Sequence, residues 1–132
     1  MPDRFHILVV DDEPNVLITY RLILEQQGYR VSASILSADA RNTLSSDRVD
    51  LLLCDLSLEG QESGFDVIEY ARHLTPGIAT VLLTGYATPE ANERAEKSGI
   101  PVLFKPIDIQ QLLETISRLL RNDHELRQAS GD

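Results

Sequence analysis

The sequence predicts an α/β fold in which a parallel, five-stranded sheet is covered by helices on both faces. Short apolar runs alternate with segments of helical periodicity along the chain, the pattern of strands joined by crossover helices. The central run, residues 51–54, is apolar without alternation, as expected of a strand buried on both faces. Because parallel sheets bind ligands outside the carboxyl ends of their strands, Asp55, which ends this run, is the first candidate for a functional residue.

The first half of the chain predicts two strands and two helices before the central strand. Residues 5–10 form an apolar run that stops at an acidic segment, and residues 15–27 place apolar side chains at helical spacing until Gly28 offers a left-handed helix end. Residues 29–35 alternate apolar and polar side chains, which indicates a strand near an edge of the sheet. A weak helix capped by Ser37 then leads to the central strand.

The second half continues the alternation with three helices and two strands. Only alanines serve as apolar anchors in the fourth helix, so this helix should be loosely held, whereas the fifth has the strongest helical periodicity of the chain. The expected elements are a helix around 67–74, a strand over 79–83, a helix over 89–98, a strand over 102–104 and a helix over 109–121.

The composition indicates one acidic domain. A length of 132 residues suits a single domain, which we place at residues 1–121, followed by a polar C-terminal tail over residues 122–132. The 12 Lys and Arg against 21 Asp and Glu give a formal net charge of −9, so the surface should repel nucleic acid and anionic membranes. The amino terminus lacks the charged-then-apolar pattern of a secretion signal, no apolar run approaches about 18 residues, and the single Cys54 permits no internal disulfide. We therefore expect a cytoplasmic protein without direct nucleic-acid or membrane contacts.

Polar side chains follow four of the predicted strands, at the point where each strand ends. Since the carboxyl ends of parallel strands share one edge of the sheet, Asp11, Asp12, Asp55, Thr84 and Lys105 should lie together there. Three close carboxylates repel one another unless a cation lies among them, and carboxylate and carbonyl oxygens favour Mg²⁺. An ammonium and a hydroxyl beside the metal can stabilise the charge on a phosphoryl group during its transfer. In such a transfer we expect one of the carboxylates to act as the nucleophile.

Four motifs in this order resemble the receiver domain of two-component response regulators. The resemblance extends over about residues 5–121 and implies a flavodoxin-like, doubly wound sheet of strand order 2-1-3-4-5 with five helices. The motifs are Val-Val-Asp-Asp-Glu-Pro at 9–14, Leu-Leu-Leu-Cys-Asp-Leu at 51–56, Leu-Leu-Thr-Gly-Tyr at 82–86 and Phe-Lys-Pro at 104–106.

The resemblance also implies roles for the acidic residues. Asp55 would accept a phosphoryl group from a histidine kinase or phosphotransfer protein. Asp12 and Asp55 would bind Mg²⁺ directly, Asp11 would act through water, and Ser57 would contribute its backbone carbonyl. The protein would then be a signalling module that assists its own phosphorylation and dephosphorylation, rather than an enzyme.

The resemblance also implies how phosphorylation would be sensed and passed on to a partner. Thr84 and Lys105 would sense the phosphoryl group, and the peptide bond between Lys105 and Pro106 would be cis. The surface made by the fourth helix, the fifth strand and the fifth helix would then bind a downstream protein effector or a second copy of the chain. Since only a short polar segment follows the last helix, the effector would be another protein or part of a longer chain.

Two departures from the family pattern affect these expectations. Between Asp55 and Gly64 there is one residue more than is common, and Glu59 stands where a proline is frequent, so the loop over the metal should have its own shape. Val102 replaces a frequent aromatic residue that swings inward on activation. We expect the signal to travel instead through movement of the loosely held helix over 89–98.

Other interpretations of the same residues stay open at this point. Asp12 alone is compatible with a helix cap, Thr84 with a hydroxyl bonded to backbone, Lys105 with a surface charge, and Cys54 with a small buried side chain. The three histidines are too scattered to form a ligand set. Two competing functions are a pseudo-receiver that binds partners constitutively and a stand-alone aspartyl phosphatase, which the separation of Asp12 from Asp55 disfavours.

Overall fold

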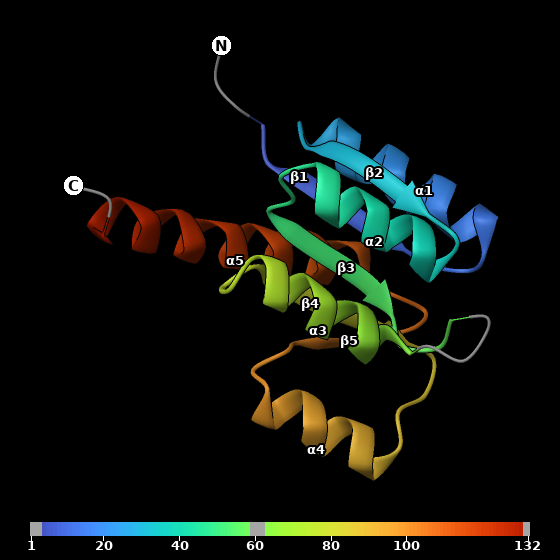
Figure 1. Cartoon of the computed structure of the whole chain (residues 1–132). Helices are drawn as coiled ribbons and strands as arrows, with labels where there is room; N and C mark the ends of the chain where they lie inside the picture. Colours follow the sequence, from blue (N-terminus) through green and yellow to red (C-terminus); the bar gives the residue numbers. More distant parts are fainter. Residues whose placement is uncertain (1–3, 59–62, 131–132) are drawn as a thin grey trace.

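The computed structural model describes residues 4–58 and 63–130, with side chains of the last helix described as far as residue 121. Within these residues, strands and helices alternate strictly along the chain (Figure 1). The elements are β1 (His6–Val10), α1 (Pro14–Gln26), β2 (Arg30–Ser34), α2 (Ser37–Ser46), β3 (Leu51–Asp55), α3 (Gly64–Leu74), β4 (Ala79–Thr84), α4 (Pro89–Lys97), β5 (Val102–Phe104) and α5 (Ile109–Ser130).

The five strands form one parallel sheet in the order β2-β1-β3-β4-β5, which confirms the predicted fold class and strand order. The predicted position of β2 at an edge is also confirmed. In the register of the sheet, Cys54 of β3 lies beside Val10 of β1 and Leu82 of β4. The carboxyl ends of these three strands therefore meet at one edge of the sheet, to the right in Figure 1.

Two apolar layers, one on each face of the sheet, make the core. One layer includes residues of α2, α3 and α4, and the other includes residues of α1 and α5. Alternate residues of β3 contribute to opposite layers, with Leu52 and Cys54 in the first and Leu51 and Leu53 in the second. This division explains why the strand is apolar at every position, since both of its faces are covered.

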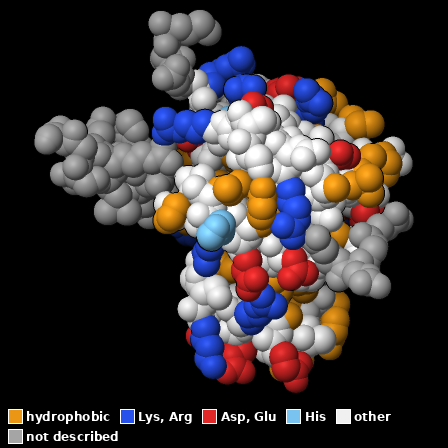
Figure 2. Space-filling view, in the orientation of Figure 1, with side chains coloured by type: hydrophobic (Ala, Val, Ile, Leu, Met, Phe, Trp, Pro, Cys, Tyr) orange, Lys and Arg blue, Asp and Glu red, His pale blue; other side chains and the backbone are white. Residues whose placement is uncertain are grey.

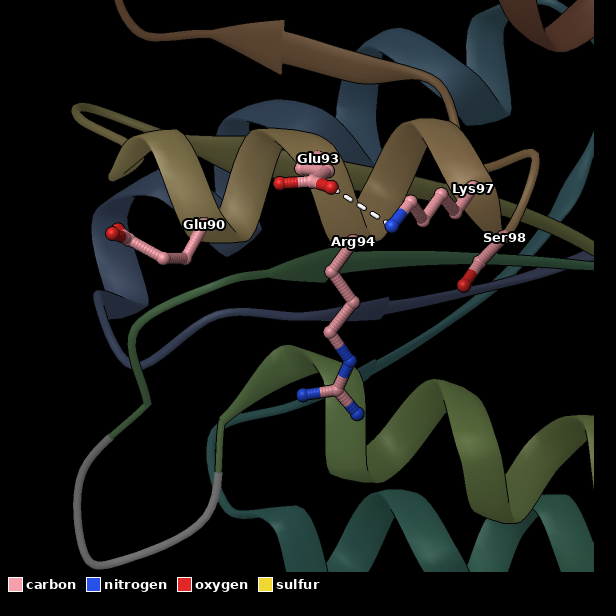
Figure 3. A pocket seen from close by; sticks show the side chains of 5 residues that line it. All are labelled: Glu90, Glu93, Arg94, Lys97 and Ser98. Atoms are coloured by element: carbon pink, nitrogen blue, oxygen red, sulfur yellow. Dashed lines mark ion pairs between the residues drawn. The ribbon is translucent and has the colours of Figure 1, made fainter.

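The helix α4 has little apolar anchoring, as its alanine-only pattern predicted. Ala95 is its one buried residue, and a polar side chain provides its cross-link to α3. The guanidinium of Arg94 lies over the ring of Phe65, 4.3 Å from its centroid, and forms an ion pair with Glu69. Figure 3 shows Arg94 extending from α4 towards α3, while Glu93 and Lys97 pair along α4 itself.

Two helix ends differ from the sequence prediction. Leu36 occupies the cap position of α2 and Ser37 is its first residue, so the prediction that Ser37 caps this helix is wrong. The backbone of α5 is helical to Ser130, beyond the end of the domain that we placed at residue 121. Residues 125–129 of the added segment, Glu-Leu-Arg-Gln-Ala, are good helix formers, so the backbone continues the helix although the segment has few apolar positions.

Within the described residues, the structure has no helix that is both long and apolar enough to span a membrane.

Truncation of Ile116 should test the packing of α5 on the sheet. Its side chain is fully buried, so Ile116→Ala should lower the free energy of unfolding by about 2–5 kcal/mol. Leu22→Ala is the control, because this side chain is 57% exposed and its truncation should change stability by less than about 0.5 kcal/mol. Chemical denaturation measures both, and equal effects would contradict the described packing.

Candidate functional site

Three carboxylates lie together at the carboxyl edge of the sheet. Asp11 and Asp12 directly follow β1, and Asp55 is the last residue of β3. Each offers a carboxylate oxygen, and these oxygens all lie within 4.8 Å of one another. Asp11 is fully buried, Asp55 is 6% exposed and Asp12 is half-buried. The neighbouring strands β1 and β3 therefore place the acids where the topology predicted.

Backbone hydrogen bonds orient two of these acids in the same way. The N–H of Glu13 donates to Oδ1 of Asp11 at 3.0 Å, and the N–H of Ser57 donates to Oδ1 of Asp55 at 3.1 Å. Each bond spans two residues, as in the turns that aspartate forms with its own backbone. The two Oδ2 atoms are thereby left to face other groups of the site.

Lys105 occupies the space between these two Oδ2 atoms. Its Nζ donates to Asp11 at 2.9 Å and to Asp55 at 3.0 Å. Lys105 follows β5, and its own N–H donates to the carbonyl oxygen of Thr84 at the end of β4. The peptide bond between Lys105 and Pro106 is cis, as the family resemblance implied.

The electrostatics of the site leave a negative excess. Burial raises the pKa of Asp55, and the charge of Asp11 adds to this effect, while hydrogen bonds from Lys105 and Ser57 act against it. Burial disfavours the charge of Lys105, but its hydrogen bonds and attraction to Asp11 and Asp55 raise the pKa of the ammonium above its usual value. One ammonium therefore compensates for part of the charge of three carboxylates.

This donor set fits a hard divalent cation. The three carboxylates supply oxygen ligands at close range, and the excess of negative charge favours a doubly positive ion. Asp11, Asp12 and Asp55 are the side chains that could hold it. Ser57, the other expected ligand, lies two residues beyond β3 at the same edge. The expected shape of the loop at Glu59 falls on residues 59–62, outside the described part of the chain.

Thr84 lies at the same edge but its hydroxyl is engaged elsewhere. The side chain is buried at the end of β4, and the hydroxyl donates to the carbonyl oxygen of Tyr86 at 2.6 Å. The N–H of Tyr86 donates back to the Thr84 hydroxyl at 3.1 Å. The hydroxyl thus stabilises the first turn of the β4–α4 loop. It would have to leave Tyr86 in order to bind a ligand at Asp55.

The sequence pattern did not identify Gly64, which opens α3. A Cβ atom at this position would lie 2.4 Å from the carbonyl oxygen of Asp55. The glycine belongs to a helix and is not among those with positive φ, so a turn does not account for it. The sequence did contain a signal of this close approach, because Gly64 comes shortly after the strand that ends in Asp55 and near the start of a predicted helix.

Comparisons with known proteins identify the family to which this fold belongs. A family model described as the response regulator receiver domain matches residues 7–117. The Escherichia coli transcriptional regulatory protein ZraR is 28% identical over 94% of this chain, and the Pseudomonas putida alginate biosynthesis regulator AlgB is 34% identical over 95% of it. The chain spans 28% and 27% of the lengths of these two relatives, about a quarter of each.

The fold also resembles solved structures. The crystal structure of a CheY-like response regulator receiver domain protein from Methanospirillum hungatei superposes with a TM-score of 0.87 at 28% sequence identity. The superposition covers 93% of this chain and 98% of that one.

Asp55→Asn should stabilise the metal-free protein at neutral pH. The pKa of Asp55 is raised above its ordinary value of 3.8, so ionisation of this carboxyl costs stability as the pH rises through the pKa of the folded state. The gain in unfolding free energy should be present at pH 7 and should vanish well below pH 3.8, where the wild-type carboxyl is protonated in both states. Chemical denaturation in EDTA across this range measures it.

Asp39→Asn provides the matched control for that measurement. Asp39 is an exposed acid in the first turn of α2, where its charge is favourable, so its neutralisation should give no gain. A loss of stability in Asp55→Asn at pH 7 would contradict the electrostatic description of the site.

Proposed function

Because the chain belongs to the family of response regulator receiver domains, we propose that Asp55 is its phosphoacceptor and that phosphorylation alters a protein-binding surface. The observation that carries the proposal is the contact of Asp55 with Lys105, beside Asp11 and Asp12, at the end of the central strand. The contact supports the proposal because phosphotransfer to a carboxylate would need a nucleophilic oxygen, a nearby cation and metal ligands in one small site. The chain then acts as a signalling module of a two-component system.

We assign the metal-binding role to Asp11, Asp12, Asp55 and the backbone carbonyl of Ser57. Oxygen ligands of this kind suit Mg²⁺, which uses one or two carboxylates and keeps several waters. The bound ion would offset the negative charge on the oxygens of the phosphoryl group. The close spacing of the three carboxylates supports this assignment.

In the transfer step, a carboxylate oxygen of Asp55 attacks the phosphorus of a phosphohistidine on a histidine kinase or phosphotransfer protein. The new P–O bond forms as the P–N bond breaks, and the electron pair of that bond returns to the imidazole nitrogen. Lys105 is already within hydrogen-bond distance of Asp55, so its ammonium can bind a phosphoryl oxygen without a large movement. Its second hydrogen bond, to Asp11, holds the ammonium in place while its bond to Asp55 is replaced by one to the phosphoryl oxygen.

The readout begins at Thr84. A phosphoryl group on Asp55 offers charged oxygens, which are stronger acceptors than the carbonyl of Tyr86 that now binds the Thr84 hydroxyl. Transfer of this hydrogen bond frees the first turn of the loop that leads to α4. Because Val102 stands where the family pattern often has an aromatic ring, the movement of this loop and of α4 would convey the signal.

The surface that changes is suited to a protein partner. Tyr86, Phe104 and Ile109 are large apolar side chains that are 73%, 52% and 37% exposed, and they lie after β4, at the end of β5 and at the start of α5. We propose that a downstream effector protein, or a second copy of the chain, binds here. Among the described residues on the side shown in Figure 2, acidic and basic side chains are interspersed and form no extended basic patch for nucleic acid. The relatives named as transcriptional regulators favour a cytoplasmic location.

Phosphorylation by a small phosphodonor tests the assignment of Asp55. Acetyl phosphate with MgCl₂ should add the mass of one phosphoryl group to the intact protein, measured by mass spectrometry. Asp55→Asn should gain no mass, and EDTA should suppress the reaction of the wild type because the phosphoryl charge is then poorly offset. Asp47→Asn, in the segment between α2 and β3 that precedes the amino end of this strand, should react like the wild type. An unmodified wild type would indicate a pseudo-receiver.

Arg94→Ala tests the role of α4 in the switch. Loss of the contacts of Arg94 with Phe65 and Glu69 should lower the unfolding free energy by about 1 kcal/mol, since this side chain is partly exposed. It should also speed phosphorylation by acetyl phosphate several-fold, because α4 is then freer to adopt the position that follows phosphorylation. Lys97→Ala, which removes a pair within α4, is the control and should leave the rate unchanged. An unchanged rate in Arg94→Ala would exclude this route.

A further inference from the structure

The close approach of Gly64 to the strand that carries Asp55 points to a role in the site. A Cβ atom at Gly64 would lie 2.4 Å from the carbonyl oxygen of Asp55 and 3.0 Å from the Cα of Leu56. Both neighbours are backbone atoms, which cannot turn aside as the end of a long side chain would. A side chain at position 64 would therefore displace either α3 or the peptide that joins Asp55 to Leu56.

The backbone on both sides of this contact is firmly held. Leu56 donates its N–H to the carbonyl oxygen of Leu83 in β4 at 2.8 Å and accepts the N–H of Gly64 at 2.8 Å. On the other side, α3 is anchored in the core by the buried side chains of Phe65 and Ile68. A displacement at Gly64 thus acts on the short segment between the end of β3 and the start of the following loop.

Further contacts connect the start of α3 with Ser57. Ser57 and Ser63 form an isolated antiparallel bridge, so the chain leaving β3 is paired with the chain entering α3. Ser63 is fixed in turn because its N–H donates to Oδ2 of Asp66 at 2.8 Å. The orientation of the Ser57 backbone therefore depends on how closely α3 lies against the end of β3.

We propose that Gly64 is a positioning residue for the metal ligands Asp55 and Ser57, because its bare Cα lets α3 pack against the backbone between them. The inference rests on the proposed function, which assigns these two residues to Mg²⁺. Mg²⁺ requires nearly ideal octahedral geometry, whereas Ca²⁺ accepts longer and more variable distances to its ligands. A small displacement of this segment therefore weakens Mg²⁺ binding more than Ca²⁺ binding.

The test compares metal selectivity in Gly64→Ala and the wild type, using NMR titrations of the full chain with MgCl₂ and, separately, CaCl₂. In Gly64→Ala the affinity for Mg²⁺ should fall about tenfold or more, as for other residues that orient metal ligands, and the affinity for Ca²⁺ should fall less. The ratio of the two affinities should consequently shift towards Ca²⁺. A loss of stability alone would not change this ratio.

Gly77→Ala is the matched control. It also adds one methyl group to a glycine, and at φ +87° it strains the backbone, but no atom lies within 4 Å of the new Cβ. Gly77 precedes β4, at the sheet edge away from the site. This variant should lose stability and keep the wild-type ratio of affinities.

Two outcomes separate the two proposals. A wild type that binds no Mg²⁺ would overturn both the proposed function and the inference. A wild type that binds Mg²⁺, with an unchanged ratio in Gly64→Ala, would overturn the role of Gly64 alone. Should Gly64→Ala not fold, Asp66→Ala carries the test, because it releases Ser63 while keeping glycine at 64. It should shift the ratio in the same direction by a smaller factor, and an unchanged ratio would again overturn the inference.

Discussion

The ion pairs of Lys105 with Asp11 and Asp55 are the interaction on which the rest of the site depends. They join residues at the carboxyl ends of β1, β3 and β5, which come together only when the sheet has the observed strand order. Buried charges are costly unless they are paired. The fold brings these charges together, and their pairing in turn lowers the cost of burying them in this fold. The ammonium that holds these two carboxylates in the resting site also lies where the phosphoryl oxygens of the proposed reaction would arrive.

Much of this arrangement could be predicted because it follows from topology. The unbroken apolar pattern of residues 51–54 reflects a strand covered on both faces, which identified the centre of the sheet. Once the strands are parallel, polar residues that end them must share an edge, which brings Asp11, Asp55 and Lys105 together without any knowledge of side-chain geometry. The weak anchoring of α4 was likewise visible in its alanines, since apolar contact area scales with side-chain size.

Other features depend on local geometry that periodicity does not record. The Thr84 hydroxyl rotates to the nearest acceptor, which is the carbonyl of Tyr86 in the following loop, and its residue type alone does not select this partner. The approach of Gly64 to Asp55 depends on how closely a helix and a strand pack, a distance that the spacing of apolar residues does not fix. The helical backbone beyond residue 121 reflects intrinsic propensity, which an argument from apolar periodicity overlooks.

The single cysteine, Cys54, has a consequence for experiments on this domain. Its thiol is buried in β3, and both this burial and the neighbouring charge of Asp55 raise its pKa, so the reactive thiolate is scarce in the folded protein. Alkylating reagents will therefore modify the chain chiefly when the centre of the sheet opens. Alkylation of Cys54 would thus report opening of the sheet one residue from Asp55, the proposed phosphoacceptor.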